Sequence, residues 1–193
     1  MHVDSNSTGD AARHVRLADI ETRFAALPPA PADAGRVHLI VARVESGRRK
    51  TPDSVTLTPE SGIPGDAWGR RPPLMPEAQI TVMQIDVAEL IANGQPLELF
   101  GDNLFLALDL SVGNLPIGSR VRIGGATFEI TPKPHNGCKK FRARFGDDAL
   151  AFVSRPDIRH RNLRGIYMRV TAGGVVARGD RVDVLHRASG GTS

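Results

Sequence analysis

Short apolar segments separated by glycine and proline are the feature of this sequence that most constrains its fold. From Val37 onward, runs rich in β-branched residues, such as VHLIVARV, SVTLT and AQITVMQID, are each only a few residues long. The chain contains 20 glycines and 14 prolines, many of them between these runs, where they favour bends. Many short strands joined by tight bends favour a mostly β fold, either a β-barrel or a folded sheet.

Two segments predict paired strands, and one predicts a helix. In SRVRIGGATFEIT, apolar and polar residues alternate on both sides of Gly124-Gly125, which is typical of a β-hairpin. The segment GIYMRVTAGGVVARGDRVDVL, which bends at two glycine-containing turns, predicts a second hairpin-like unit. VAELIANG is expected to form a short helix that ends at Gly94.

The first 35 residues differ from the rest and are predicted to be an N-terminal extension. The polar first ten residues are expected to be disordered. Residues 11–27 carry apolar side chains near helical spacing, which predicts a short amphipathic helix, and LPPAPADAG then forms a Pro/Ala linker. The helix packs either on the domain or on a partner, and a loosely docked extension is the favoured interpretation. Residues 36–187 are predicted to form one domain, and residues 188–193 a disordered tail.

Cysteine content and hydropathy bear on the compartment. The single cysteine excludes an internal disulfide and a zinc site built from several cysteines, and it favours a reducing environment. The N-terminus lacks the apolar core of a secretory signal, and no apolar run approaches the ~18 residues of a membrane span. We therefore expect a cytoplasmic protein without a membrane partner.

The charge of the chain suits an anionic ligand. The formal net charge is +4, which is compatible with a phosphate group or a nucleic acid. Aromatic residues make up only 5% of the chain, which leaves few rings for stacking on bases. A basic β-barrel that binds nucleic acid is therefore the weaker alternative.

The single cysteine lies in PKPHNGCKKF, a proline-bounded and strongly basic segment. Cationic neighbours of Cys138 stabilise a thiolate, the form of cysteine that acts as a nucleophile or binds soft metals. Gly137 would allow the backbone to approach a ligand closely. The alternatives are an inert cysteine in a loop and a solvated basic face. The basic side chains nearest to the cysteine are Lys133, His135, Lys139, Lys140 and Arg142.

Two acidic positions stand at glycine turns. Asp66 lies in GIPGDAWG, and Asp102 and Asn103 lie in FGDNLF. Side chains of this type most often hydrogen-bond to the local backbone. A second possibility is that a carboxylate holds a lysine or arginine of a ligand pocket.

Five segments follow one another along the chain: GIPGDAWG, FGDNLFL, VGNLPIGSRVRIGGATFEIT, the cysteine segment and NLRGIYMRVTAGGVVARGDRV. In this order they resemble the MOSC family, named after the C-terminal domain of molybdenum cofactor sulfurase, and in particular its small stand-alone bacterial members. The resemblance covers roughly residues 37–185. In two places the sequence departs from the family pattern, with Gly137 where proline is common and Ala67-Trp68 where basic residues are common.

The resemblance implies a fold and a site. The fold would be a β-barrel related to the barrel domain of pyruvate kinase, with a few short helices. The chain would bind the molybdenum cofactor, with Cys138 as the catalytic residue and molybdenum ligand, or as a carrier of persulfide sulfur. Asp66, Asn103 and Arg164 match residues of the family's motifs. The resemblance places these three in the cofactor site, together with Lys133, His135, Lys139, Lys140 and Arg142.

The resemblance also implies an activity. Small members of the family resemble reductases of N-hydroxylated compounds that work with a redox partner protein. The alternative is a non-catalytic carrier of sulfur or of the cofactor itself.

Overall fold

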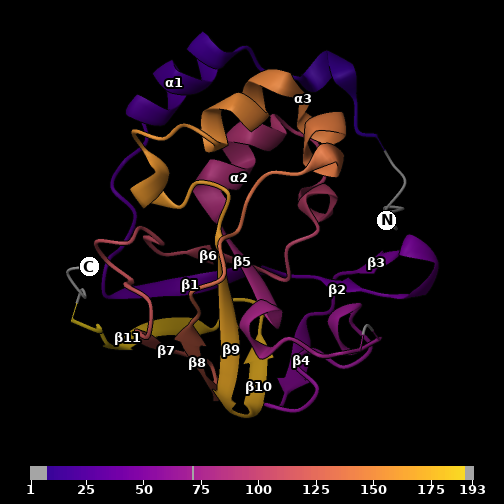
Figure 1. Cartoon of the computed structure of the whole chain (residues 1–193), viewed down its shortest axis with the longest axis vertical. Helices are drawn as coiled ribbons and strands as arrows, with labels where there is room; N and C mark the ends of the chain where they lie inside the picture. The colour runs from indigo at the N-terminus through magenta and orange to yellow at the C-terminus, as the bar shows by residue number, and fades with distance from the viewer. Residues whose placement is uncertain (1–7, 71, 190–193) are drawn as a thin grey trace.

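A closed β-barrel forms the lower part of the molecule (Figure 1). The computed structural model describes residues 8–70 and 72–189. Within this part of the chain, the barrel strands follow one another in the order β1 (Ala34–Ile40), β11 (Arg181–His186), β7 (Arg120–Ile123), β8 (Ala126–Ile130), β9 (Ile166–Ala172), β5 (Ile80–Gln84) and β6 (Leu104–Ala107). The expectation of a mostly β barrel with a few short helices is confirmed.

Alternating side chains fill the barrel. In β8 the first, third and fifth residues are buried, and Ile130 pairs with Met168 of β9. Neighbouring barrel strands are antiparallel except β5 and β6, which run parallel, with Val82 opposite Leu104. Phe128 and Leu104 are fully buried among the apolar side chains of the interior. The barrel is therefore a packed core rather than a channel.

Two short sheets lie beside the barrel. β4 (Ser54–Leu57) pairs with β10 (Gly174–Ala177), and β2 (Ala42–Arg43) pairs with β3 (Arg49–Lys50). The hairpin predicted at Gly124-Gly125 is present as β7 and β8. The second predicted hairpin-like unit is wrong, because β10 pairs with β4, and β11 pairs with β1 and β7.

Helices cover one end of the barrel (Figure 1). They are α1 (Leu17–Ala25), α2 (Ile85–Ala92) and α3 (Lys139–Val153). The predicted helix before Gly94 is α2, and its C-cap is Asn93, in a left-handed conformation. α3 was not expected from the sequence, and Gly146 (φ 91°) interrupts it. Short 3-10 turns complete the elements: η1 (Ala11–Arg13), η2 (Glu45–Gly47), η3 (Trp68–Arg70), η4 (Pro76–Ala78), η5 (Leu97–Phe100) and η6 (Arg159–Arg161).

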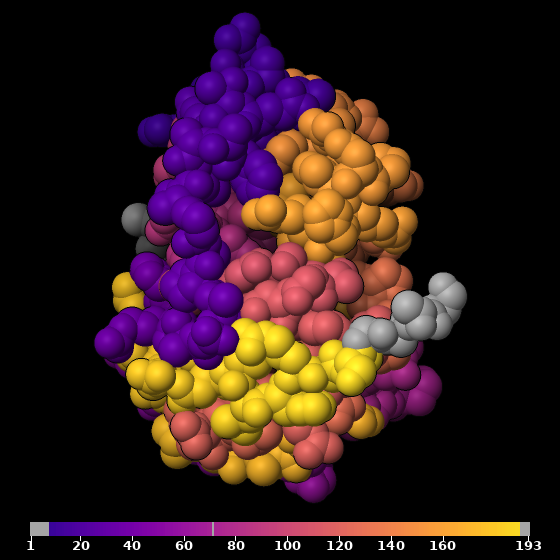
Figure 2. All heavy atoms as spheres, turned by 90° about the vertical axis from the view of Figure 1, so that its left-hand side faces the viewer, coloured from indigo at the N-terminus to yellow at the C-terminus, as the bar shows by residue number. Residues whose placement is uncertain are grey.

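The N-terminal extension packs firmly on the domain, which corrects the expectation of a loosely docked helix. Figure 2 shows this segment (indigo) along the face of α3 (orange). Ile20 of α1 is fully buried beneath the helices, and burial of such a side chain contributes about 1.5–3 kcal/mol. His14 contacts the interruption in α3, where its Nε2 lies 3.2 Å from the carbonyl oxygen of Arg144.

The chain ends extend beyond the described residues. The disorder predicted for residues 1–10 and 188–193 falls largely on positions 1–7 and 190–193, which lie outside them. Asp10 accepts a hydrogen bond from the Ala12 amide, and the Ala188 amide donates to Ser119. None of the helices formed by residues 8–70 and 72–189 is long and apolar enough to cross a membrane.

Candidate functional site

A cavity of about 610 Å³ lies between the β2–β3 turn, the turn that follows Asp66, and the beginning of α3. Segments far apart in the sequence line it, so the barrel and the helical layer must both be folded before it exists. The cavity, called the Cys138 cavity below, is lined by residues 43–49, Ala67, Arg70, Phe100, Gly101, Cys138, Lys140, Phe141 and Arg144.

Cys138 is exposed at the edge of this cavity. It is the N-cap residue of α3, with an extended backbone, and its carbonyl oxygen accepts the Arg142 amide at 3.0 Å. A side chain placed at Gly137 would meet Leu150 of α3, since an added Cβ would lie 2.3 Å from Leu150 Cδ1. The close approach expected at Gly137 is therefore made to α3.

Positive charge dominates the Cys138 cavity. Its cationic side chains outnumber its one acidic side chain, Glu45. Arg49 and Arg144 are buried, with 6% and 3% of their surface exposed. Burial lowers the pKa of Arg144 from its usual value. Guanidinium groups in such a cavity attract phosphate and other anions. The cationic side chains are Arg43, Arg48, Arg49, Arg70, Lys140 and Arg144.

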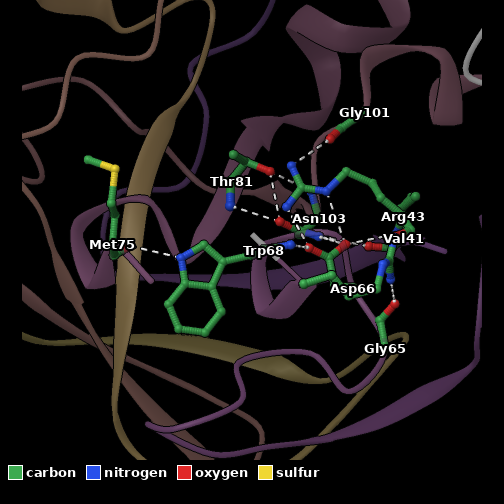
Figure 3. Close-up of polar contacts among 10 residues, drawn as sticks. Val41, Arg43, Gly65, Asp66, Trp68, Met75, Thr81, Gly101 and Asn103 are labelled. Carbon is green, nitrogen blue, oxygen red and sulfur yellow. Dashed lines mark hydrogen bonds and ion pairs between the residues drawn. The ribbon is translucent and has the colours of Figure 1, made fainter. Parts of the chain in front are cut away.

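Asp66 holds Arg43 at the rim of the cavity (Figure 3). Arg43 donates from Nε to Oδ1 of Asp66 at 3.0 Å and from Nη2 to Oδ2 at 2.6 Å. Burial opposes ionisation of Asp66, but Arg43 holds the pKa of this carboxyl below its usual value. Asp66 also accepts the Trp68 amide at 2.9 Å, so it serves the local turn as well as the cation.

Asn103 supports this pair from behind. Its Nδ2 donates to Asp66 Oδ1 at 3.1 Å and to the Val41 carbonyl at 3.0 Å. Its Oδ1 accepts the amide and hydroxyl of Thr81 in β5, at 3.1 and 2.9 Å. With 0% of its surface exposed, Asn103 acts on a ligand only through the position of Asp66 and Arg43 (Figure 3).

Asp102 organises a second, buried cluster. Arg164 donates from Nη1 to Asp102 Oδ2 at 2.7 Å, and His135 Nε2 lies 3.4 Å from Asp102 Oδ1. Side-chain exposure is 7% for Arg164, 1% for Asp102 and 8% for His135. Gly165 (φ 101°) fixes the chain beside Arg164, because an added Cβ would lie 2.1 Å from the Val82 carbonyl oxygen.

His135 is neutral in this cluster. Burial, together with the charge of Arg164, lowers its pKa from 6.5 to about 4, although Asp102 acts in the opposite direction. Its ring lies 4.7 Å from the ring of Tyr167. His135 and Arg164 do not line the Cys138 cavity, and both line a separate cavity of about 350 Å³.

The remaining predicted site residues lie elsewhere. Lys133 lines a different cavity of about 270 Å³, beside Pro116 and Ile130. Lys139 is exposed and outside the Cys138 cavity, and Arg142 forms an exposed ion pair with Asp147. Of the basic residues predicted near the cysteine, Lys140 is the one that lines its cavity.

Sequence analysis missed most of the arginines of the cavity. Arg43, Arg48 and Arg49 come from the VARVESGRRK segment, far from the cysteine in sequence. Arg144 lies in α3, a helix that was not predicted from the sequence. Its place in the wall of the Cys138 cavity was therefore not predicted either. The sequence held one signal for such an arginine, which was Asp66 at its glycine turn. A carboxylate that becomes buried there requires a cation as its partner.

A sequence model identifies the family of the chain, and solved structures of other proteins share its fold. The sequence model of the MOSC domain matches residues 75–183, more than half of the 193-residue chain. The YUAD protein of Bacillus subtilis has a similar structure (TM-score 0.56, 21% identity, 81% of this chain and 97% of that chain). YiiM of Escherichia coli is also similar (TM-score 0.54, 22% identity, 80% and 71%). A search of curated proteins gave no significant match.

Proposed function

Because the chain belongs to the MOSC domain family, we propose that the Cys138 cavity binds the molybdenum cofactor. MOSC domains are associated with this cofactor, a pterin that carries a phosphate and a dithiolene-bound metal. One observation carries the proposal: a single cavity combines an exposed thiol with six cationic side chains.

The donor set of the cavity fits such a group. The Cys138 thiolate is a soft ligand suited to a metal that already carries sulfur ligands. Arg49, Arg144 and Lys140 supply charge-assisted donors for the phosphate. Arg43 is held by Asp66, so its guanidinium is oriented before a ligand arrives. A concave cavity of this volume, lined by cations, suits a small anion better than it suits the backbone of a nucleic acid.

The cofactor, when bound, supplies the electron chemistry, and we propose the reduction of N-hydroxylated compounds as the reaction. The N–O bond of the substrate is cleaved, a redox partner protein supplies two electrons, and solvent supplies two protons. One proton replaces the hydroxyl group on nitrogen, and the other leaves with the hydroxyl oxygen as water. The residues of this chain bind and orient. Cys138 holds the metal, the arginines neutralise the phosphate, and Asn103 keeps the Asp66–Arg43 pair in place.

Cofactor content tests the proposal. The wild type and Cys138→Ala are purified without oxygen from cells that make the cofactor. Pterin is assayed as its fluorescent oxidation product, and molybdenum by elemental analysis. We expect near-equimolar pterin and metal in the wild type, and loss of most of the metal in the variant. Neither species in the wild type, even after reconstitution with free cofactor, would contradict the proposal.

The exposure of Cys138 also favours a second candidate, a carrier of persulfide sulfur or of the cofactor. Turnover separates the two functions. A reductase cycles with an electron donor, whereas a carrier gives one stoichiometric transfer to an acceptor enzyme.

A further inference from the structure

The helix α3 consists of two segments joined at Gly146, and the first of them lines the Cys138 cavity. Gly146 has φ 91° and ψ 170°, far from helical values. The first segment, residues 139–145, therefore carries a large part of the cavity wall. The lining residues in this segment or at its N-cap are Cys138, Lys140, Phe141 and Arg144.

Side chains from outside α3 bind the end of this first segment. The carbonyl oxygen of Arg144, two residues before the break, accepts a hydrogen bond from Gln95 Nε2 at 3.2 Å. It also lies 3.2 Å from His14 Nε2. A carbonyl oxygen can only accept, so His14 donates from Nε2 in this contact. Carbonyl groups at the end of a helix need such partners, and His14 and Gln95 supply them here.

The N-terminal extension crosses the break as a strap, defined here as residues 9–17. Its 3-10 turn η1 lies beside α3 (Figure 1). The Asp10 amide donates to Gln95 Oε1 at 2.7 Å, so one buried amide side chain binds both the strap and the first segment of α3. The Leu17 amide donates to Asp148 Oδ2 at 3.1 Å. The strap is therefore tied to α3 on both sides of the break.

Two glycines allow the strap and α3 to approach this closely. An added Cβ at Gly146 would lie 2.9 Å from Nδ1 of His14. An added Cβ at Gly9 would lie 2.4 Å from the carbonyl oxygen of Arg144. Both glycines have a positive φ, which other residues rarely adopt. The place of the His14 ring thus depends on the absence of a side chain at the break.

Arg144 connects the strap to the cavity. Its backbone carbonyl contacts His14, while its Nη1 donates to the Leu99 carbonyl oxygen at 2.6 Å. Burial lowers the pKa of Arg144, and the charge of the Cys138 thiolate opposes this lowering, which places the guanidinium within electrostatic reach of the sulfur. A shift of the Arg144 backbone would therefore change the distance between a cation and the thiol.

We propose that His14 is a positioning residue of the Cys138 cavity. Through the carbonyl oxygen of Arg144, it holds the first segment of α3 in the geometry that binds an anion. The MOSC domain model matches residues 75–183, so the strap lies outside the residues that match the family. The inference rests on the proposed function in taking this cavity as the anion site, and it is tested without the cofactor.

Protection of Cys138 by phosphate tests the inference, because Cys138 is the sole cysteine of the chain. The cofactor-free full chain reacts with the thiol reagent DTNB at increasing inorganic phosphate and constant ionic strength. Phosphate in the cavity slows the reaction, and half-protection gives its Kd. We expect His14→Ala to weaken phosphate binding about two- to tenfold, the effect of one lost hydrogen bond. No protection of the wild type, or equal affinities in the two proteins, would overturn the inference.

Two further variants separate positioning from general packing of the extension. His14→Gln keeps an Nε2 donor with similar reach, and we expect it to bind phosphate as the wild type does. Ile20→Val removes one methyl group from the buried part of α1 and leaves His14 in place, so phosphate affinity should not change. An equal loss of affinity in His14→Ala and in either of these variants would contradict the role of the His14 hydrogen bond.

Hydrogen exchange locates the effect within α3. We expect His14→Ala to speed the exchange of amides in residues 139–145 more than in residues 147–153. Equal changes in the two segments, or no change, would contradict a strap that holds the first segment. If the wild type binds no cofactor while His14→Ala still weakens phosphate binding, the proposed function fails and the role of His14 stands.

Discussion

Asp102 and Asn103 are adjacent in the chain, yet they build two regions with opposite properties. Asn103 supports Asp66 and Arg43 at the Cys138 cavity, whereas Asp102 binds Arg164 in a buried cluster. The two side chains have different partners, although their residues are adjacent just before β6. The Arg43 side chain is 26% exposed and that of Arg164 is 7% exposed. The Asp66–Arg43 ion pair thus orients a cation at the ligand cavity. The Asp102–Arg164 ion pair stabilises the folded protein.

The largest expected effect is the loss of stability when the buried Asp102–Arg164 ion pair is broken. Arg164→Met leaves the Asp102 carboxylate buried without its cation, and we expect the free energy of unfolding to fall by about 3–5 kcal/mol. Urea denaturation at neutral pH measures this loss. The double variant Asp102→Asn with Arg164→Met should recover much of it, because no unpaired charge remains. If Arg164→Met lowered the free energy of unfolding no more than Arg43→Met does, the comparison between the two regions would fail.

The next effect depends on pH and concerns His135. The folded protein keeps this histidine neutral, with a pKa of about 4, while the ordinary value is 6.5. Below that ordinary value the unfolded chain binds a proton that the folded chain does not, so stability falls as the pH drops toward 4. We expect a contribution of about 3 kcal/mol to be lost across this window, with no further loss below it.

His135→Gln provides the control for this pH dependence. Denaturation curves measured from neutral to acidic pH should show a shallower decline for the variant than for the wild type. Identical pH profiles would show that His135 is not held neutral in the folded state.

Loss of the Asp66–Arg43 ion pair should destabilise the protein less. In Arg43→Met, Asp66 keeps the hydrogen bonds from Asn103 and from the Trp68 amide, so its buried carboxylate is not left without partners. We expect a loss of about 1–3 kcal/mol in the free energy of unfolding. Cofactor content after reconstitution should fall, because a fixed guanidinium has been removed. Unchanged cofactor content in a folded variant would remove Arg43 from the site.

The smallest effects distinguish two neighbouring lysines. Lys140 lines the Cys138 cavity and Lys139 does not, although both are exposed. We expect Lys140→Gln to weaken cofactor binding up to about fivefold, the size of an exposed charge pair. Lys139→Gln should leave binding unchanged, and so should Arg142→Gln. Equal weakening by both lysine variants would indicate general attraction of anions rather than a site.

Much of the fold could be predicted from the sequence, because alternation is a local property. The β7–β8 hairpin and α2 follow from patterns within about a dozen residues. α3 was missed because a basic run after two prolines resembles a loop, while the apolar face that buries Phe145 and Phe152 begins only later. The pairing of β10 with β4 was missed because β-pairing between distant segments leaves no local signal.

The candidate site could be predicted only in part, for a related reason. Cys138 and Lys140 were found because they are neighbours in sequence, and Asp66 was found at its glycine turn. Arg43 and Arg49 reach the cavity through a short sheet whose formation depends on tertiary contacts. The positions of His135 and Arg164 outside the Cys138 cavity depend on their contacts with Asp102, which the resemblance does not specify.

The ligand environment of molybdenum tests the central claim most directly. X-ray absorption at the molybdenum edge is recorded for the reconstituted wild type and for Cys138→Ala. The account predicts that the metal in the wild type has one more sulfur neighbour than the metal in the variant. The same sulfur coordination in both proteins would contradict the role of Cys138 as the ligand that holds the metal in this cavity.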